Sequence, residues 1–316
     1  LGVVFLLLII NISVNMFATS KIDDEIQSNI RDLDLGDDAE IEYDDISYSF
    51  ISSTLSFENI YIGEDDEFLK IEELSIKFDP DAIPSKKDIE DGNIEIDLSD
   101  FELSLENLKL VVDGGVVKQK KLNLNFDGSF SNEKDILSTK YLFINAEGTN
   151  LSPEEGGNIS IGNYGLKFES ENSINLMDLE SEIGNIEELD DLYDMSLEMN
   201  VENYDLPRAF LREFDLDEFG ISELEGKEIE LRLEKNNQEV DFGLELGSNS
   251  LGTIDVEGNF DFSKDTDNPY VELKLTLEDL DRNIDKMLQM SKLEETKNGY
   301  KLDFKGSLNK LQKSLF

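Results

Sequence analysis

Cysteine and histidine are both missing from this 316-residue chain. Without cysteine it has neither a disulfide framework nor a thiolate metal site. Without histidine it lacks the commonest general base and the commonest transition-metal ligand. No Gly-rich phosphate loop and no Gly-x-Ser-x-Gly nucleophile elbow occurs, and carboxylates are too numerous for any single pair to stand out. We therefore predict a protein that is not an enzyme and needs no cofactor or metal.

Basic residues are scarce: 28 Lys and Arg stand against 73 Asp and Glu, for a net charge of −45. Such a surface repels nucleic acid and anionic headgroups. Two explanations compete, a calcium-binding surface and adaptation to a salty medium. The segments nearest to calcium loops, "DLDLGDDAE" (32–40) and "DFSKDTDNPY" (261–270), do not fit the EF-hand spacing. Because acidic residues are spread along the whole chain, we favour salt adaptation and predict no nucleic-acid partner.

The longest uncharged stretch is "LGVVFLLLIINISVNMFATS" at 1–20, about the length that crosses a bilayer as a helix. A cleaved signal peptide is the alternative, but "NMFATS" lacks a clean small-x-small cleavage site. Helical spacing continues through Ile22, Ile26, Ile30 and Leu33. We predict a transmembrane anchor at 1–20 and an amphipathic stalk at 21–35. The protein would be single-pass, with its bulk outside the cytoplasm on the periplasmic or cell-surface side.

From residue 36 on, the apolar period changes to two. Runs such as "KEIELRLE" (227–234) have one apolar and one charged face, which is typical of antiparallel meanders. "VVDGGVV" (111–117) and "EKNNQEV" (234–240) are hairpin signals. Helical spacing returns at 174–195, 206–220 and 277–295. We predict a mainly β protein with a curved antiparallel sheet, a β-rich part at 36–170, and a second β-rich part at 171–316 with amphipathic helices on or capping the sheet.

Three strand-like segments share a break in their alternation: "LSFENIYI" (55–62), "LKIEELSI" (69–76) and "LSLENLKL" (103–110). Two polar residues separate two alternating apolar runs, which would reverse the apolar face unless a β-bulge absorbs one of them. Bulges at Glu58-Asn59, Glu72-Glu73 and Glu106-Asn107 would keep the apolar residues on one side and bend the strands. Unrelated strand ends with acidic turns are the alternative.

With its N-terminal apolar segment and these leucine-alternating strands, the chain resembles the AsmA-like proteins, part of a wider group of repeating β-groove, or bridge-like, lipid-transfer proteins. The resemblance is strongest in the anchor and at 45–130. It implies a membrane-anchored envelope protein that binds or transfers lipid along an apolar groove, with membrane lipids as partners. The groove would be lined by Phe57, Leu74, Leu103, Leu105, Leu110, Leu122, Leu124 and Phe126. The alternative is an anchored structural or protein-interaction domain whose sheets cover each other as a β-sandwich.

Overall fold

The computed structural model describes residues 40–49, 52–63, 67–79, 95–112, 114–131, 136–153, 157–175, 194–212, 223–249, 251–263, 265, 268–289 and 293–315. Its strands are β1 (Glu40–Glu42), β2 (Asp45–Ser49), β3 (Thr54–Gly63), β4 (Phe68–Lys77), β5 (Glu95–Asp97), β6 (Phe101–Val112), β7 (Gly115–Ser131), β8 (Ile136–Pro153), β9 (Ile159–Asn175), β10 (Met195–Pro207), β11 (Glu223–Asn236), β12 (Glu239–Ser248), β13 (Gly252–Asp261), β14 (Tyr270–Glu278), β15 (Glu294–Glu295) and β16 (Gly299–Ser307).

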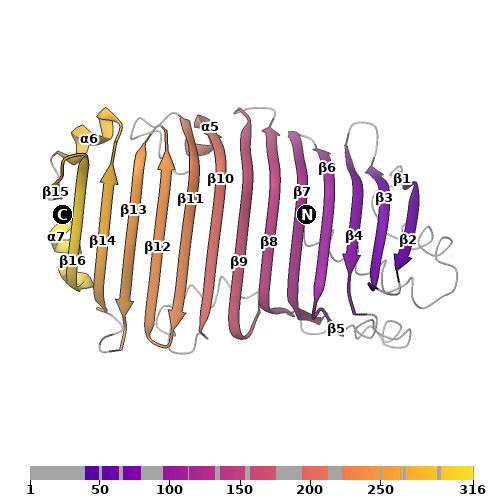
Figure 1. The fold of residues 1–316 in the computed structure, drawn as a ribbon, viewed down its shortest axis with the longest axis horizontal. Helices are drawn as coiled ribbons and strands as arrows, with labels where there is room; N and C mark the ends of the chain where they lie inside the picture. Colours follow the sequence, from indigo (N-terminus) through magenta and orange to yellow (C-terminus); the bar gives the residue numbers. More distant parts are fainter. Residues whose placement is uncertain are drawn as a thin grey trace.

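All of these strands belong to one 16-stranded sheet, and every pairing is antiparallel. The order is almost that of the chain: β1 and β2 both pair β3, β5 pairs the far end of β7, and β15 lies beside β16. Figure 1 shows the strands side by side along the long axis, from β1 and β2 at one end to β16 at the other. The prediction of a mainly β, antiparallel fold is confirmed, and the described strands form no second sheet.

The two predicted hairpins are present. Val112 pairs with Gly115 at the β6–β7 turn, and Asn236 pairs with Glu239 at the β11–β12 turn. Asn237 in the second turn has a φ of 52°. That conformation is one that asparagine tolerates better than most residues, which explains the local sequence.

Helices are shorter than their apolar spacing suggested. The three described ones are α5 (Arg208–Arg212), α6 (Arg282–Leu288) and α7 (Leu308–Leu315), of which α7 was not predicted. The edges of the predicted helices at 174–195, 206–220 and 277–295 are strand instead, because β9, β10 and β14 extend into them. The remainder of the first, 176–193, and the end of the second, 213–220, lie outside the described residues.

The predicted anchor at 1–20 and stalk at 21–35 also lie outside the described residues. Within the described part of the chain, no helix has the length and apolar character needed to span a bilayer.

The break in alternation has a structural counterpart that crosses the sheet. The β3–β4 ladder skips one residue on each strand, Asn59 and Glu72, while the pairs on either side keep a constant register. The same happens on each following pair up to β11, except that the β4–β6 ladder skips two residues on each strand, Ile71 and Glu72 opposite Asn107 and Leu108. This line of skipped positions, which we call the crease, consists of Asn59, Glu72, Asn107, Lys120, Gly148, Gly162, Asn203 and Lys227.

Every second strand of the crease carries a residue in the left-handed region: Asn59, Asn107, Gly148 and Asn203 have φ values of 51°, 53°, 70° and 52°. Along the crease, the extra residue on one strand therefore faces an extra residue on the next, and the first two-against-one bulge of the crease is at Lys227, where β11 meets β12. Separate register shifts lie away from the crease, between Asp127 and Gly128 of β7 and between Thr139 and Tyr141 of β8.

The predicted bulges at Glu58-Asn59, Glu72-Glu73 and Glu106-Asn107 are thus wrong, because the skipped residues of neighbouring strands face one another and the register stays constant. Their predicted consequence is confirmed, since Phe57 and Ile60, on either side of Asn59, both belong to one buried cluster.

Two buried clusters anchor the sheet. The larger one spans β3 to β7 and includes Leu55, Ile71 and Leu74, which are at most 2% exposed. The smaller one joins Tyr204 and Leu224 to Leu211 of α5 and to Leu251. At Gly226 a Cβ would clash with the hydroxyl oxygen of Tyr204, so glycine is required where the tyrosine crosses its neighbouring strand.

Candidate functional site

One face of the sheet is apolar across nearly its whole length, and we call it the apolar face. Cross-strand pairing aligns its side chains in rows that run perpendicular to the strands. The central row consists of Leu55, Ile76, Leu103, Leu124, Ile144, Leu166, Met199, Leu231, Leu244, Val256, Leu275 and Leu302. No described strand interrupts this row with a charge.

Exposure changes along the apolar face. In β3 to β6 the central row is buried, with Leu55 at 0% and Leu103 at 6% exposure. From β8 to β14 the same row is half-buried throughout. We call this second part the apolar window, which contains Ile144, Leu166, Met199, Leu231, Leu244, Val256 and Leu275 and, in the next row, Leu142, Leu197, Leu233, Phe242 and Leu273.

The eight residues predicted to line a groove share the apolar face, but all of them lie outside the window, on β3, β4, β6 and β7. The register joins Phe57, Leu74, Leu105 and Leu122 in one row, Leu103 and Leu124 in the next, and Phe126 one row further. Leu110 lies beyond the crease, opposite Leu69. Five of the eight are buried core residues: Phe57, Leu74, Leu103, Leu105 and Phe126, at 2–7% exposure. Only Leu110, Leu122 and Leu124 are half-buried.

Sequence reasoning missed the window because its strands look like those of the core. "IELRL" at 229–233 and "LSL" at 103–105 alternate in the same way, and alternation does not tell which apolar side chains are covered. One signal in the sequence distinguishes the later strands from the first ones. Strands beyond residue 227 carry no break in alternation, as expected where the crease ends.

The described helices reach the ends of the strands rather than the window. α5 contacts β10 and β11, where Leu211 and Phe210 pack with Tyr204 and Leu224. α7 contacts β14 and β16 and buries Leu311. Figure 1 shows α5 and α6 at one end of the strands.

A few polar groups are buried in the apolar face, and each is satisfied. Next to the crease, the Gln119 amide donates to the backbone carbonyls of Lys121 and Glu147, at 2.8 and 2.9 Å. Its Oε1 accepts a hydrogen bond from the Thr149 hydroxyl at 2.5 Å. Lys235, 4% exposed, forms an ion pair with Asp194 at 3.7 Å. These groups stabilise irregular backbone or turns inside an apolar environment.

Two tyrosines of this face have altered acidity. Burial raises the pKa of Tyr204, whose hydroxyl donates to the carbonyl of Gly247 at 3.2 Å. Burial also raises the pKa of Tyr164, and a hydrogen bond with the Thr149 side chain opposes the shift. Tyr164 remains half-buried in the row beside the crease.

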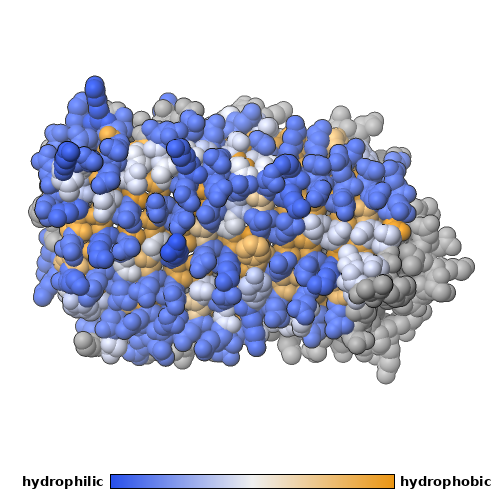
Figure 2. Space-filling view, viewed as in Figure 1, coloured by the Kyte–Doolittle hydropathy of each residue, from blue (hydrophilic) through white to orange (hydrophobic). Residues whose placement is uncertain are grey.

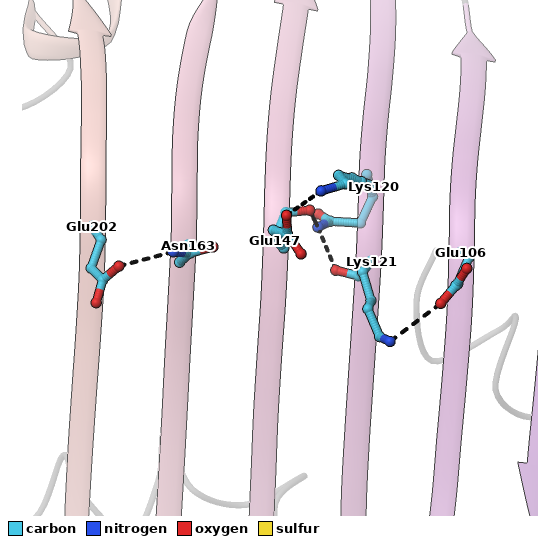
Figure 3. A network of polar contacts seen from close by, with 7 residues as sticks. Glu106, Lys120, Lys121, Glu147, Asn163 and Glu202 are labelled. Carbon is cyan, nitrogen blue, oxygen red and sulfur yellow. Dashed lines mark hydrogen bonds and ion pairs between the residues drawn. The ribbon is translucent and has the colours of Figure 1, made fainter.

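The opposite face is polar and carries ion pairs between neighbouring strands. Figure 3 shows Lys121 with Glu106, Lys120 with Glu147, and the Asn163 amide with Glu202. Further pairs follow the register: Lys77 with Glu102, Lys274 with Glu257, and Lys305 with Glu272. The space-filling view in Figure 2 shows hydrophilic residues prevailing, with a broken band of hydrophobic ones along the middle.

The polar face also contains an open hollow of about 410 Å³ over β10 to β16. Its charged lining has six carboxylates and three basic groups: Glu198, Glu234, Asp241, Glu257, Glu272, Asp303, Arg232, Lys274 and Lys305. The basic groups are already engaged with carboxylates, so the hollow presents no concentrated charge of either sign that would select a ligand. Across the described residues, no group of acidic side chains is arranged to hold a metal ion.

Comparisons with protein-family models, curated proteins and solved structures found no match to this chain. The geometry of the two faces is therefore the basis on which we infer a function.

Proposed function

We propose that this protein is a membrane-anchored envelope protein that binds or transfers lipid along its apolar face. The observation that carries the proposal is the apolar window, where rows of aliphatic side chains remain half-buried over β8 to β14. Apolar surface of this extent is rare on soluble proteins unless it serves binding. Hydrocarbon chains fit such a surface, because they gain from leaving water without needing directional contacts.

The anchor at 1–20 and an extracytoplasmic location are part of the proposal and derive from the sequence alone. An anchored structural or protein-interaction domain is the second candidate. Its sandwich form needs a second sheet, and the described strands supply only one. The polar face offers little to hydrocarbon chains, because it carries charged side chains, some of them in ion pairs between strands.

The test compares two neighbouring residues on opposite faces of β14. Leu275 lies in the window, and Thr276 lies on the polar face. Leu275→Asp places a charge among hydrocarbon contacts, where it is costly to desolvate, whereas Thr276→Asp adds the same charge on the wet side. The full chain and both variants are purified, and bound lipid is extracted and measured by mass spectrometry.

We expect lipid on the parent protein and on Thr276→Asp, and a large loss on folded Leu275→Asp. Circular dichroism reports whether each variant is folded. A parent protein without lipid, or equal lipid on both variants, would contradict the proposal.

A further inference from the structure

The two ends of the sheet are built differently. At one end β3 is covered by two short strands, β1 and β2, of three and five residues. At the other end β16 runs for nine residues, without proline, and its ladder with β14 has no bulge. Among the described residues, β15 alone covers its outer side, at Tyr300 and Lys301 (Figure 1). A long, regular edge strand of this kind is ready to pair with a further strand.

The backbone of β16 directs Asp303 and Lys305 outward. Successive residues of a strand point their N–H and C=O groups to opposite sides. The carbonyl of Gly299 accepts a hydrogen bond from Thr296, on the side of β15, so the odd-numbered residues of β16 face outward. Lys301 pairs with β15, whereas no described residue pairs with the outer backbone of Asp303 or Lys305. Their N–H and C=O groups are therefore open to a partner strand.

Two copies of this edge can pair antiparallel about a two-fold axis, and charge selects one register. An axis at Asp303 places two aspartates opposite each other, and an axis at Lys305 places two lysines opposite each other, which is destabilising in both cases. An axis at Phe304 places Asp303 opposite Lys305 of the second copy, twice. Phe304 is also the centre of the open stretch, because β15 occupies the edge as far as Lys301 and α7 begins at Leu308.

The same register continues a pattern of alternating charge on the polar face. Glu257 forms an ion pair with Lys274 at 3.3 Å, and Lys274 lies opposite Asp303. Lys305 of the second copy would be the next side chain in that row. In the neighbouring row Glu272 pairs with Lys305 at 2.6 Å, and Asp303 of the second copy would follow. Each row would then alternate in sign across the junction.

We infer that β16 is a self-association edge through which two copies of this chain join into one continuous sheet. Each Asp303–Lys305 pair exchanges backbone hydrogen bonds and adds an ion pair on the polar face. Phe304 meets Phe304 of the second copy on the apolar side, so the two apolar faces adjoin. Because the pairing is symmetric, it stops at two copies. The inference goes beyond lipid binding and does not depend on it.

Sedimentation equilibrium of the full chain tests the inference, at about 0.15 M salt, where charges are screened beyond about 8 Å. The open edge is short, so we expect a weak dimer with a Kd on the order of 10–100 µM. Asp303→Lys and Lys305→Asp should each weaken the dimer by about tenfold or more, because each turns both ion pairs into repulsive contacts. Combining the two changes in one chain should restore the dimer.

A mixture of the two single variants gives the sharper result. Asp303→Lys has lysine at both positions and Lys305→Asp has aspartate at both, so they should form a mixed dimer more tightly than either pairs with itself. Net charge alone predicts the opposite for Asp303→Lys, since that change lowers self-repulsion. Lys118→Asp and Asp255→Lys are the matched controls, because they make the same charge changes at exposed positions of inner strands and should leave the dimer unchanged.

Lys305→Pro tests the backbone independently of charge pairing. It removes an outward N–H and leaves the ladder with β14 intact, so it should abolish the dimer while circular dichroism stays unchanged. A parent protein that is monomeric up to about 1 mM, a dimer that persists in Lys305→Pro, or single variants that do not prefer each other would overturn the inference. Growth into assemblies larger than dimers would also overturn it, because it would mean head-to-tail pairing. None of these results bears on lipid binding, which lipid extraction measures separately.

Discussion

Replacing Gln119 by leucine tests whether the crease depends on one side chain. At the crease the β7–β8 ladder skips Lys120 and Gly148, and the Gln119 amide bonds the carbonyls of Lys121 and Glu147 on either side. Leucine has nearly the same size but no polar atoms. The Gln119→Leu variant leaves two carbonyls and the Thr149 hydroxyl without these partners on the apolar face.

The expected loss of stability follows from these three groups, the two carbonyls and the Thr149 hydroxyl. A buried acceptor left unsatisfied costs about 1–3 kcal/mol, and the added apolar surface of leucine returns part of it. We therefore expect Gln119→Leu to lower the free energy of unfolding by about 2–4 kcal/mol. The assay is urea unfolding followed by circular dichroism, with the slope of the transition checked for constancy.

The control is Gln289→Leu, at an exposed position directly after α6, where the amide donates to the Asp285 carboxylate at 3.2 Å. Surface changes of this kind stay within about 0.5 kcal/mol. If Gln119→Leu costs less than about 1 kcal/mol, the carbonyls find water or other partners, and the account of the crease is wrong.

Four other outcomes are expected. The melting temperature of the protein should rise as NaCl is added, because a net charge of −45 is self-repelling and salt screens it over about 10 Å at 0.1 M; a constant value would contradict salt adaptation. In urea unfolding, Leu74→Ala should cost about 2–5 kcal/mol and Leu275→Ala clearly less, because Leu74 is 2% exposed and Leu275 half-buried; equal losses would mean that the window is covered. Asn107→Ala should cost about 1 kcal/mol in the same assay, because alanine tolerates a left-handed φ less well than asparagine does, while Asn107→Gly should cost less; similar losses in both would point to the hydrogen bond of Asn107 with Glu72 instead. Because burial raises the pKa of Tyr204, its protonated form contributes stability that is complete below about pH 10 and lost as the pH rises further, so Tyr204→Phe should flatten the fall in stability at alkaline pH; an unchanged fall would assign it to other groups.

Much of the fold was accessible from local sequence. Alternation identified the strands, and Asp-Gly-Gly and Asn-Asn-Gln identified two hairpin turns, because side-chain period and turn chemistry are properties of neighbouring residues. The repeated Glu-Asn break also predicted that the apolar residues stay on one side, which the cluster containing Phe57 and Ile60 confirms. Helix prediction was poorer, because strand pairing extends into segments whose spacing also fits a helix, as at Met195 and Leu277.

The candidate site was only partly predictable. The sequence identified which residues face the apolar side, but it placed the groove at Leu74, Leu103 and Leu105, which are buried in the core of the first strands. Exposure depends on what packs above a side chain, and residues distant in the chain decide that. The hydrogen bonds of Gln119 with Thr149 and with the carbonyls of Lys121 and Glu147 were not predictable either, since no spacing pattern links residues of neighbouring strands.

The sequence by itself determined the period of the strands, their turns, the acidic surface and the single apolar face, because each follows from residues close together in the chain. Only the tertiary structure decided that the skipped residues line up as one crease across eight strands, because that alignment requires the register of every pair to agree. It also decided where the apolar face is buried and where it remains half-open, because burial is a property of the assembled sheet and not of any one strand.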